Sequence, residues 1–230
     1  MKDFSFFEKK IDYFFSDKKL LKEAFTHRSY LNENPSGGGS HNERLEFLGD
    51  AVLELIATEF LFKKFKEMPE GELTLLRSAL VNANMLSTVA SELEINDFLF
   101  LSRGEAKDVG RARAFILANA FEAIIGALYL DGGYAAAEKF ITKYLLIRID
   151  EVLEKRLFHD AKSLFQEKAQ EFAGITPAYR VLKEWGPDHD KHFVVGVYLG
   201  EELVASGEGP SKQIAEQNAA EAGLKSKSWS

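Results

Sequence analysis

The sequence predicts an all-α N-terminal domain followed by a small α+β domain with the element order α-β-β-β-α. Two observations carry this prediction: residues 1–152 show apolar positions at helical spacing throughout, and strand-like alternation appears only after residue 160. We place the second domain at 160–228 and a linker at 153–159. The chain of 230 residues is long enough to build two hydrophobic cores.

Helices of the first domain are bounded by cap and turn signals. Ser40 with Glu43 fits a capping box, and Asn42 is an alternative cap for the same helix. Asp131-Gly132-Gly133 predicts the end of a later helix. The helices expected in this domain cover residues 16–25, 43–65, 73–93, 111–130 and 135–153.

The second domain begins and ends with a helix. Residues 161–172 have helical spacing, and the alanine-rich segment 211–225 has it again. Between them, alternating patterns predict strands over residues 179–182, 192–199 and 203–205.

Composition limits the compartment and the kind of site. The chain has no cysteine, which excludes a disulfide framework and a thiolate zinc site. Its net charge of −7 argues against a broad basic face for nucleic acid, so RNA binding must rest on particular positions. The first residues do not resemble a signal peptide, and we expect no apolar stretch of membrane-spanning length. A cytoplasmic protein is therefore expected.

Three carboxylates gather on one side of the predicted helix 43–65. Glu43, Glu46 and Asp50 are spaced i, i+3 and i+7, which places them within a sector of about 60°. Oxygen ligands of this kind suit Mg²⁺ or Mn²⁺. The alternative is an ordinary solvated acid face.

A second pair of polar residues interrupts the apolar helix 111–130. Asn119 and Glu122 are spaced i and i+3, and an unpaired carboxylate among apolar neighbours would be costly. They are therefore candidates for the remaining metal ligands. Alternatively, Glu122 caps a neighbouring helix or pairs with Arg44.

Several of these segments resemble the ribonuclease III family. The resemblance rests on residues 42–50 (NERLEFLGD), 117–123 (LANAFEA) and 126–133 (GALYLDGG), with Glu70 and residues 26–30 (THRSY) at fitting distances. Residues 160–167 and 209–220 resemble the two ends of a double-stranded-RNA-binding domain. The likeness covers nearly the whole chain in the domain order of a bacterial enzyme.

The resemblance implies an endoribonuclease that cuts both strands of double-stranded RNA and acts as a homodimer. It implies Mg²⁺ as the cofactor, with Mn²⁺ as a substitute, and products with 5′-phosphates and short 3′ overhangs. Ribosomal RNA precursors and structured messenger RNAs are the suggested substrates. Neither a membrane nor an organic cofactor is expected as a partner.

The resemblance also implies roles for individual residues of the first domain. Glu43 and Glu70 match acids near the RNA path, and Phe47 matches an aromatic residue that packs into the partner subunit. Phe47 could instead belong to the core of its own subunit. Asp50 and Glu122 match the central catalytic pair, within the implied metal-binding set Glu46, Asp50, Asn119 and Glu122.

In the second domain, the implied RNA contacts lie at three places. Gln166 and Glu167 on the first helix would enter a minor groove, and His189 between two strands would reach another. Ser211 and Lys212 would meet phosphates at the start of the last helix, although Lys212 could be an ordinary solvated lysine.

Near the acids of the first domain, two arginines are further candidates. Arg111 and Arg113 could bind the scissile phosphates, or they could pair with Glu105 or Asp108.

One position departs from the family pattern, which commonly has Asp where this chain has Asn119. An amide oxygen can still bind Mg²⁺, but it brings no charge and cannot act as a base. The change is either a natural variant that remains active or an engineered change that traps substrate. Two rival functions therefore stay open: a non-catalytic RNA-binding protein, and a helical metal-binding dimerisation module with an RNA-binding tail.

Overall fold

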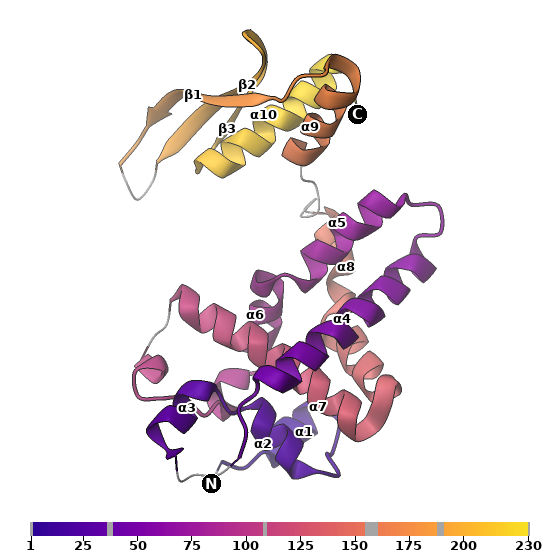
Figure 1. Ribbon diagram of the computed structural model, residues 1–230, viewed down its shortest axis with the longest axis vertical. Helices are drawn as coiled ribbons and strands as arrows, with labels where there is room; N and C mark the ends of the chain where they lie inside the picture. Colours follow the sequence, from indigo (N-terminus) through magenta and orange to yellow (C-terminus); the bar gives the residue numbers. More distant parts are fainter. Residues whose placement is uncertain (1, 36–38, 108–109, 155–160, 188–190, 230) are drawn as a thin grey trace. The chain divides into compact units, whose positions relative to one another are not determined.

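The computed structural model describes residues 2–35, 39–107, 110–154, 161–187 and 191–229. The chain divides into two compact units, Met1–Phe158 and His159–Ser230. The first unit is helical, and the second is a three-stranded antiparallel sheet with two helices (Figure 1). The predicted fold class is therefore confirmed. Most of the expected linker, 153–159, lies outside the described residues.

The first unit contains eight α-helices among its described residues, with short 3₁₀ turns between α6 and α7 and between α7 and α8. Its two longest helices, α4 and α7, form the centre, and α6 packs on α7 (Figure 1). The helices are α1 (Ser5–Ile11), α2 (Lys18–Ala24), α3 (Arg28–Glu33), α4 (Glu43–Lys64), α5 (Glu70–Val81), α6 (Ala83–Glu92), α7 (Arg111–Tyr144) and α8 (Ile149–Glu154).

Two glycines let α4 and α7 cross with their backbones in contact. A Cβ atom on Gly49 would overlap the carbonyl oxygen of Glu122 and lie 2.9 Å from the nitrogen of Gly126. A Cβ atom on Gly126 would overlap the carbonyl oxygen of Leu45 and lie 3.2 Å from the nitrogen of Gly49. No side chain fits between the two helices there, so both positions require glycine.

The apolarity of α7 corrects one expectation. Among the described residues, the helical stretch Arg111–Glu154 contains a window of mean hydropathy 1.5, long and apolar enough to cross a membrane. The expectation that no stretch reaches this length is therefore wrong. About 61% of that window is buried within the unit, as in the central helix of a core.

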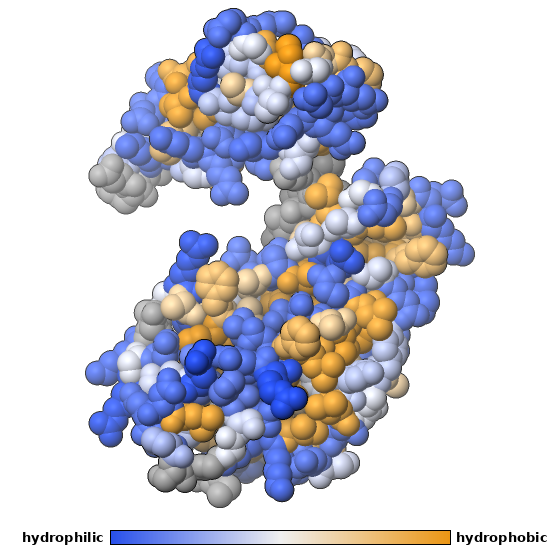
Figure 2. Space-filling view, in the orientation of Figure 1, coloured by the Kyte–Doolittle hydropathy of each residue, from blue (hydrophilic) through white to orange (hydrophobic). Residues whose placement is uncertain are grey.

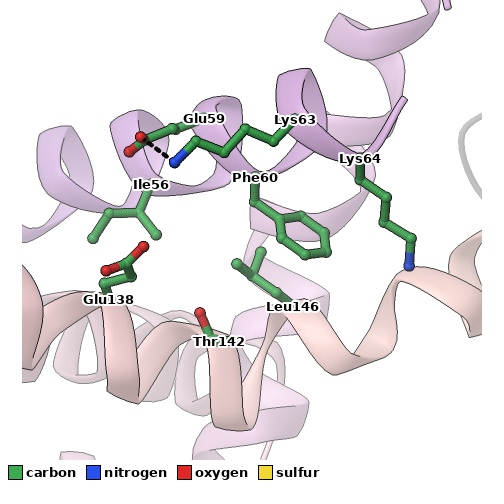
Figure 3. Close-up of a pocket in the computed structure, with 8 residues that line it drawn as sticks. All are labelled: Ile56, Glu59, Phe60, Lys63, Lys64, Glu138, Thr142 and Leu146. Carbon is green, nitrogen blue, oxygen red and sulfur yellow. Dashed lines mark ion pairs between the residues drawn. The ribbon is translucent and has the colours of Figure 1, made fainter. Parts of the chain in front are cut away.

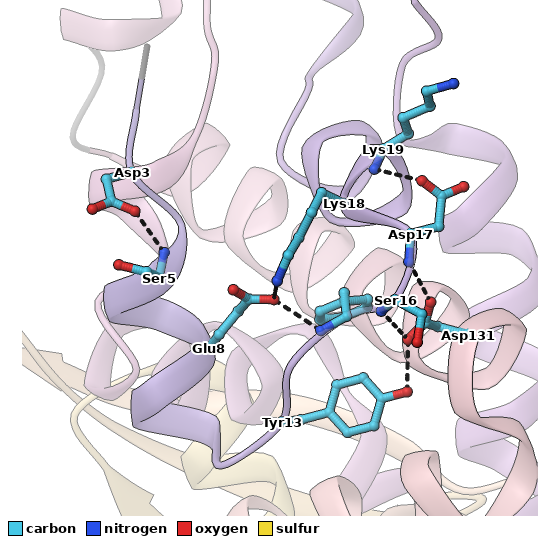
Figure 4. A network of polar contacts seen from close by, with 10 residues as sticks. Asp3, Ser5, Glu8, Tyr13, Ser16, Asp17, Lys18, Lys19 and Asp131 are labelled. Atoms are coloured by element: carbon cyan, nitrogen blue, oxygen red, sulfur yellow. Dashed lines mark hydrogen bonds and ion pairs between the residues drawn. The ribbon is translucent and has the colours of Figure 1, made fainter.

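The middle of α7 is fixed to the N-terminal segment by Asp131 (Figure 4). Its carboxylate accepts hydrogen bonds from the Tyr13 hydroxyl at 2.8 Å and from the backbone N–H groups of Ser16 at 2.9 Å and Asp17 at 2.8 Å. Burial opposes the charge, but these donors lower the pKa of Asp131 overall. Two residues later the helix bends at Gly133, which has φ 73°.

Three local predictions for this unit were wrong. The expected helix 73–93 is two helices, because Asn82 is extended and its side chain accepts a hydrogen bond from the N–H of Met85, which starts α6. The capping box does not form. Asn42 occupies the cap position of α4, but its amide donates instead to the carbonyl of Ala24. The expected helix 135–153 is divided between the end of α7 and α8.

The second unit packs two helices against a sheet of order β1-β2-β3. Its core contains Phe165 from α9, Val197 from β2 and Ala219 from α10. An irregularity in the register of β1 lies between Val181 and Lys183. The elements are α9 (Ala161–Ala173), β1 (Ala178–Trp185), β2 (His192–Leu199), β3 (Glu202–Gly209) and α10 (Lys212–Lys227).

We predict that Gly126→Ala destabilises the first unit. Alanine normally improves a helix interior by about 0.5–1 kcal/mol, but here its methyl group would force α4 and α7 apart, which costs about 1–3 kcal/mol or more. Urea unfolding should show a net loss of about 1–2 kcal/mol. Gly71→Ala is the matched control, because no atom lies within 4 Å of its added methyl group. A Gly126→Ala protein as stable as the control would refute the close crossing.

Candidate active site

The acid face predicted from the sequence begins with the first residue of α4. Glu43 and Glu46 occupy the first turn of the helix, where its dipole favours negative charge, and Asp50 follows one turn later. Glu46 is half-buried, whereas Glu43 and Asp50 are exposed. The three carboxylates therefore lie at the surface, beside the contact between α4 and α7.

The glycine crossing places Glu122 of α7 next to this face. Glu122 is half-buried, and burial together with the charges of Asp50 and Glu46 raises its pKa to about 8. Burial and the neighbouring charges of Glu43 and Asp50 also raise the pKa of Glu46. The structure thus brings Glu46, Asp50 and Glu122 together, close enough for each to oppose the ionisation of the others.

Little positive charge offsets this cluster. No ion pair joins Glu122 to another described residue, so the alternative that it pairs with Arg44 is not what the structure shows. Among the described residues, Arg28 is the one arginine or lysine within ion-pair distance of Glu43, Glu46 or Asp50, with its guanidinium 3.1 Å from Glu43. The ring of His41 lies 3.8 Å from the same carboxylate.

The donor set agrees in kind with a divalent metal. As they stand, no three described His, Cys, Asp or Glu side chains are arranged to hold an ion. The excess negative charge on Glu46, Asp50 and Glu122 is nevertheless what a divalent cation would neutralise, and all of their donor atoms are oxygens. Asn119, half-buried one turn before Glu122 on α7, can add an amide oxygen.

Two other residues singled out in the first unit lie elsewhere. Glu70 starts α5, where it accepts a hydrogen bond from Thr74 at 3.3 Å, and it borders a hollow of about 440 Å³ with Phe62, Met68 and Leu73. Phe47 follows Glu46 on α4 and is 81% exposed. The alternative that Phe47 belongs to the core of its own subunit is therefore wrong.

Residues expected to contact RNA in the second unit are on its surface where they are described. Gln166 and Glu167 are exposed on α9 and lie outside the face of the helix that buries Phe165. The Ser211 hydroxyl accepts a hydrogen bond from the N–H of Ile214 at 3.2 Å and so caps α10. Lys212 extends over the ring of Phe193. His189 lies outside the described residues.

A separate hollow of about 280 Å³ between α4 and α7 contains none of the candidate acids (Figure 3). The ion pair between Glu59 and Lys63 occupies its rim, and Ile56, Phe60 and Leu146 form its apolar wall. Because its charges are largely paired and no candidate ligand reaches it, the acid cluster is the better candidate for an active site.

Three residues important to the cluster were not singled out from the sequence. Gly49 and Gly126 set the distance between the helices, and their signals in the sequence are glycine inside an apolar helix and a place in the segments that resemble the family. Arg28 contacts Glu43 from a segment fifteen residues earlier in the chain, and spacing along one helix cannot reveal such a contact.

Comparison with known proteins identifies the family. A family model described as Ribonuclease-III-like matches residues 17–149, which include the whole acid cluster. The chain belongs to the ribonuclease III family. A second model, described as Double-stranded RNA binding motif, matches residues 161–227.

Relatives in this family cover almost the whole chain. Ribonuclease 3 of Nitratiruptor sp. is 46% identical over 225 residues, which are 98% of this chain and 97% of that protein. Ribonuclease 3 of Enterococcus faecalis is 46% identical over 92% of each chain. The solved nuclease domain of ribonuclease III from Campylobacter jejuni is 40% identical, with a TM-score of 0.57, and covers 66% of this chain and 96% of that one. The resemblance inferred from the sequence is confirmed.

We predict that Glu122→Gln stabilises the metal-free protein at high pH. The pKa of Glu122 rises from 4.5 to about 8 on folding, so the folded state holds the proton more tightly and wild-type stability falls as pH rises through that interval. Glutamine cannot ionise and avoids this loss. Above pH 8 the variant should exceed wild type by about 1–2 kcal/mol, a value reduced for partial exposure, and near pH 4.5 the difference should vanish.

Urea unfolding in EDTA at the two ends of the interval measures this effect. Glu72→Gln, an exposed acid on α5, is the control and should change little at either pH. An equal effect of Glu122→Gln at low and high pH would mean that the carboxyl group is not the titrating element.

Proposed function

We propose that this protein is a Mg²⁺-dependent endoribonuclease that hydrolyses both strands of double-stranded RNA. The observation that carries the proposal is the set of mutually repelling carboxylates on Glu46, Asp50 and Glu122 at the α4–α7 crossing. Family membership and the double-stranded RNA binding motif at 161–227 support the choice of substrate.

Glu46, Asp50, Asn119 and Glu122 would hold the metal, with Asp50 and Glu122 as the central pair. Divalent ions of this kind activate water and neutralise charge on a phosphodiester undergoing hydrolysis, and Mn²⁺ can replace Mg²⁺ in oxygen sites. The protein's part is to hold four oxygen-bearing side chains on two helices whose separation is fixed by glycine contacts. Half-burial keeps Glu122 protonated below about pH 8 until a cation offsets its neighbours.

Asn119 is treated in this proposal as a natural ligand that keeps the enzyme active. Among the described residues no cation pairs with Glu122, so the acids around Asn119 have no evident structural use. A silenced RNA-binding protein would gain nothing from holding repelling carboxylates together. The rival functions predict RNA binding without strand scission.

The second unit would bind the duplex through its polar helix face and the start of α10. Gln166 and Glu167 lie with Ser163 and Gln170 on one exposed face of α9, suited to the hydroxyl groups of a minor groove. Lys212 is exposed at the first position of α10, where the helix dipole also attracts phosphate. We assign His189 to a second groove on the resemblance alone.

Products would carry 5′-phosphates and short 3′ overhangs. Ribosomal RNA precursors and structured messenger RNAs in the cytoplasm are the proposed substrates. Arg111 lies on the same side of α7 as Asn119 and Glu122, at i+8 and i+11, where it could contact RNA beside the cluster.

An exposed apolar stripe on α4 supports the proposal of a homodimer. Phe47, Leu55 and Phe62 are 81%, 58% and 71% exposed and fall within about 80° of one another around the helix. Apolar surface over α4 is visible in Figure 2. A large exposed patch of this kind marks a protein interface.

The hollow beside Phe62 gives this interface a specific contact. At about 440 Å³ it can accept a phenylalanine side chain, and we propose that it takes Phe47 of the partner subunit. Glu70 borders the same hollow, so it would then lie near the partner's acid face. One solved structure of the Campylobacter jejuni nuclease domain concerns a region involved in dimer formation, which supports the proposal that this domain dimerises.

The activity test is cleavage of an RNA duplex of about 40 bp, which exceeds the ~16 bp that one RNA-binding domain spans. The unmodified chain should cut it in Mg²⁺ but not in EDTA, and should yield short duplexes with 5′-phosphates. Asn119→Asp should also cut. Binding without cutting, restored by Asn119→Asp, would identify a disabled nuclease, and no cutting by either protein would favour an RNA-binding function.

Phe47→Ala should weaken dimerisation by about 10- to 100-fold, because it removes a buried aromatic anchor from the interface. Sedimentation equilibrium measures the dissociation constant. The variant's monomer should unfold as wild type does, since Phe47 is exposed within its own subunit. Phe6→Ala, which removes another exposed phenylalanine from α1, is the control. If Phe47→Ala and Phe6→Ala changed the dissociation constant of the dimer equally, Phe47 would not be an anchor of the interface.

A further inference from the structure

Arg28 lies in the segment 26–30 that resembles the family, but the proposed metal site gives it no role. It is the first residue of α3, and its guanidinium lies 3.1 Å from the carboxylate of Glu43 at the start of α4. The arginine side chain is 62% exposed and the glutamate side chain 45% exposed. The pair therefore lies at the surface, at the end of the acid face.

This ion pair contributes little to holding α3 in place. Other contacts do that: the N–H of His27 donates to the carbonyl of Phe100 at 3.1 Å, and the N–H of Ser102 donates to the Ser29 hydroxyl at 3.1 Å. The His27 ring accepts from the N–H of Ser29 and caps the helix. An exposed ion pair adds about 0–1 kcal/mol, so Arg28 can leave Glu43 at small cost.

The acid face repels the RNA backbone, which the proposed reaction must bring to it. Glu43, Glu46 and Asp50 share one side of α4, and an RNA backbone approaching them carries the same charge. Arg28 is held directly against this face. Its planar guanidinium matches two oxygens of a phosphate as well as two oxygens of a carboxylate.

We propose that Arg28 binds a backbone phosphate of duplex RNA, and that Glu43 is the group it leaves when RNA arrives. The inference rests on the proposed function and adds a phosphate site to it. Glu43 precedes Glu46 by one helical turn, so the bound phosphate would lie about 5 Å along α4 from the metal-site acids. In this assignment Arg28 positions the strand, and Glu43 holds the arginine in place while the site is empty of RNA.

Glu43 has a second neighbour that supports its role as a holding group. The Nδ1 atom of His41 lies 3.8 Å from the other carboxylate oxygen and has no hydrogen-bond partner among the described residues. When Arg28 turns to a phosphate, Glu43 is therefore still beside a group that can donate to it. After the exchange, the Glu43 carboxylate would therefore still have a hydrogen-bond donor nearby, in the ring of His41.

The test is binding of a duplex of about 40 bp by the full chain in Ca²⁺ over a series of KCl concentrations. Arg28→Gln should weaken binding about 5- to 10-fold. It should also reduce the slope of log K against the logarithm of the salt concentration by about 1, because one phosphate is no longer neutralised. Arg28→Lys should restore the slope but only part of the affinity, because lysine makes no bidentate contact.

The Glu43→Gln variant tests the exchange. It should bind RNA several-fold more tightly than wild type when Arg28 is present, and this gain should largely disappear in the Arg28→Gln background. Lys139→Gln is the matched control. Lys139 forms a similar exposed pair with Asp12, at 2.9 Å and 64% and 70% exposure, but it lies beyond the bend of α7 at Gly133, and neither residue is one of the candidate acids.

Three results would overturn the proposal. In the first, Arg28→Gln binds with the affinity and salt slope of wild type. In the second, the gain from Glu43→Gln is equal in both backgrounds, which would mean simple charge repulsion without exchange. In the third, the wild-type chain neither binds nor cuts the duplex, which would overturn the proposed function as well. In the first two the wild type still cuts RNA, so only the role of Arg28 fails.

Discussion

The backbone contact between α4 and α7 is the constraint on which the site depends. At Gly49 and Gly126 the two helices touch without any side chain between them, and so the residues that flank the contact are drawn together. Glu122 faces α4 because its own carbonyl group forms part of that contact. If α4 and α7 were farther apart, the same helices and acidic residues would be present, but Glu122 would no longer lie beside Asp50.

The same contact creates an electrostatic cost. Bringing Glu122 beside Asp50 and Glu46 in a half-buried position disfavours its charge strongly enough to move its pKa to about 8. Because the surrounding core is extensive, the first unit can carry this loss of stability. Strain of this kind, concentrated at one cluster, is typical of a site that is completed by a ligand.

The sequence predicted most of the fold and the candidate acids, and its failures have local causes. Helix 43–65 and the three strands follow strong periodicity, which one segment displays without help from others. The helix break at Asn82 was missed because the apolar spacing continues through it. The predicted capping box does not form, and the amide of Asn42 donates a hydrogen bond to the carbonyl of Ala24 instead. Two contacts could not be predicted from periodicity, because each joins segments that are separate in the sequence. They are the contact of Gly49 with Gly126 and the ion pair of Arg28 with Glu43.

The placement of Phe47 links subunit association to the acid cluster. Around α4, the stripe of Phe47, Leu55 and Phe62 lies about 100° from the sector of Glu43, Glu46 and Asp50, so the two faces are neighbours on one helix. A partner docked on the stripe would border the acid face along its length, with its Glu70 beside the hollow that receives Phe47. A monomer would keep its own acids but leave one side of the RNA path open to solvent. In the proposed dimer, association would be part of the construction of the active site, because α4 would supply both metal ligands and the interface.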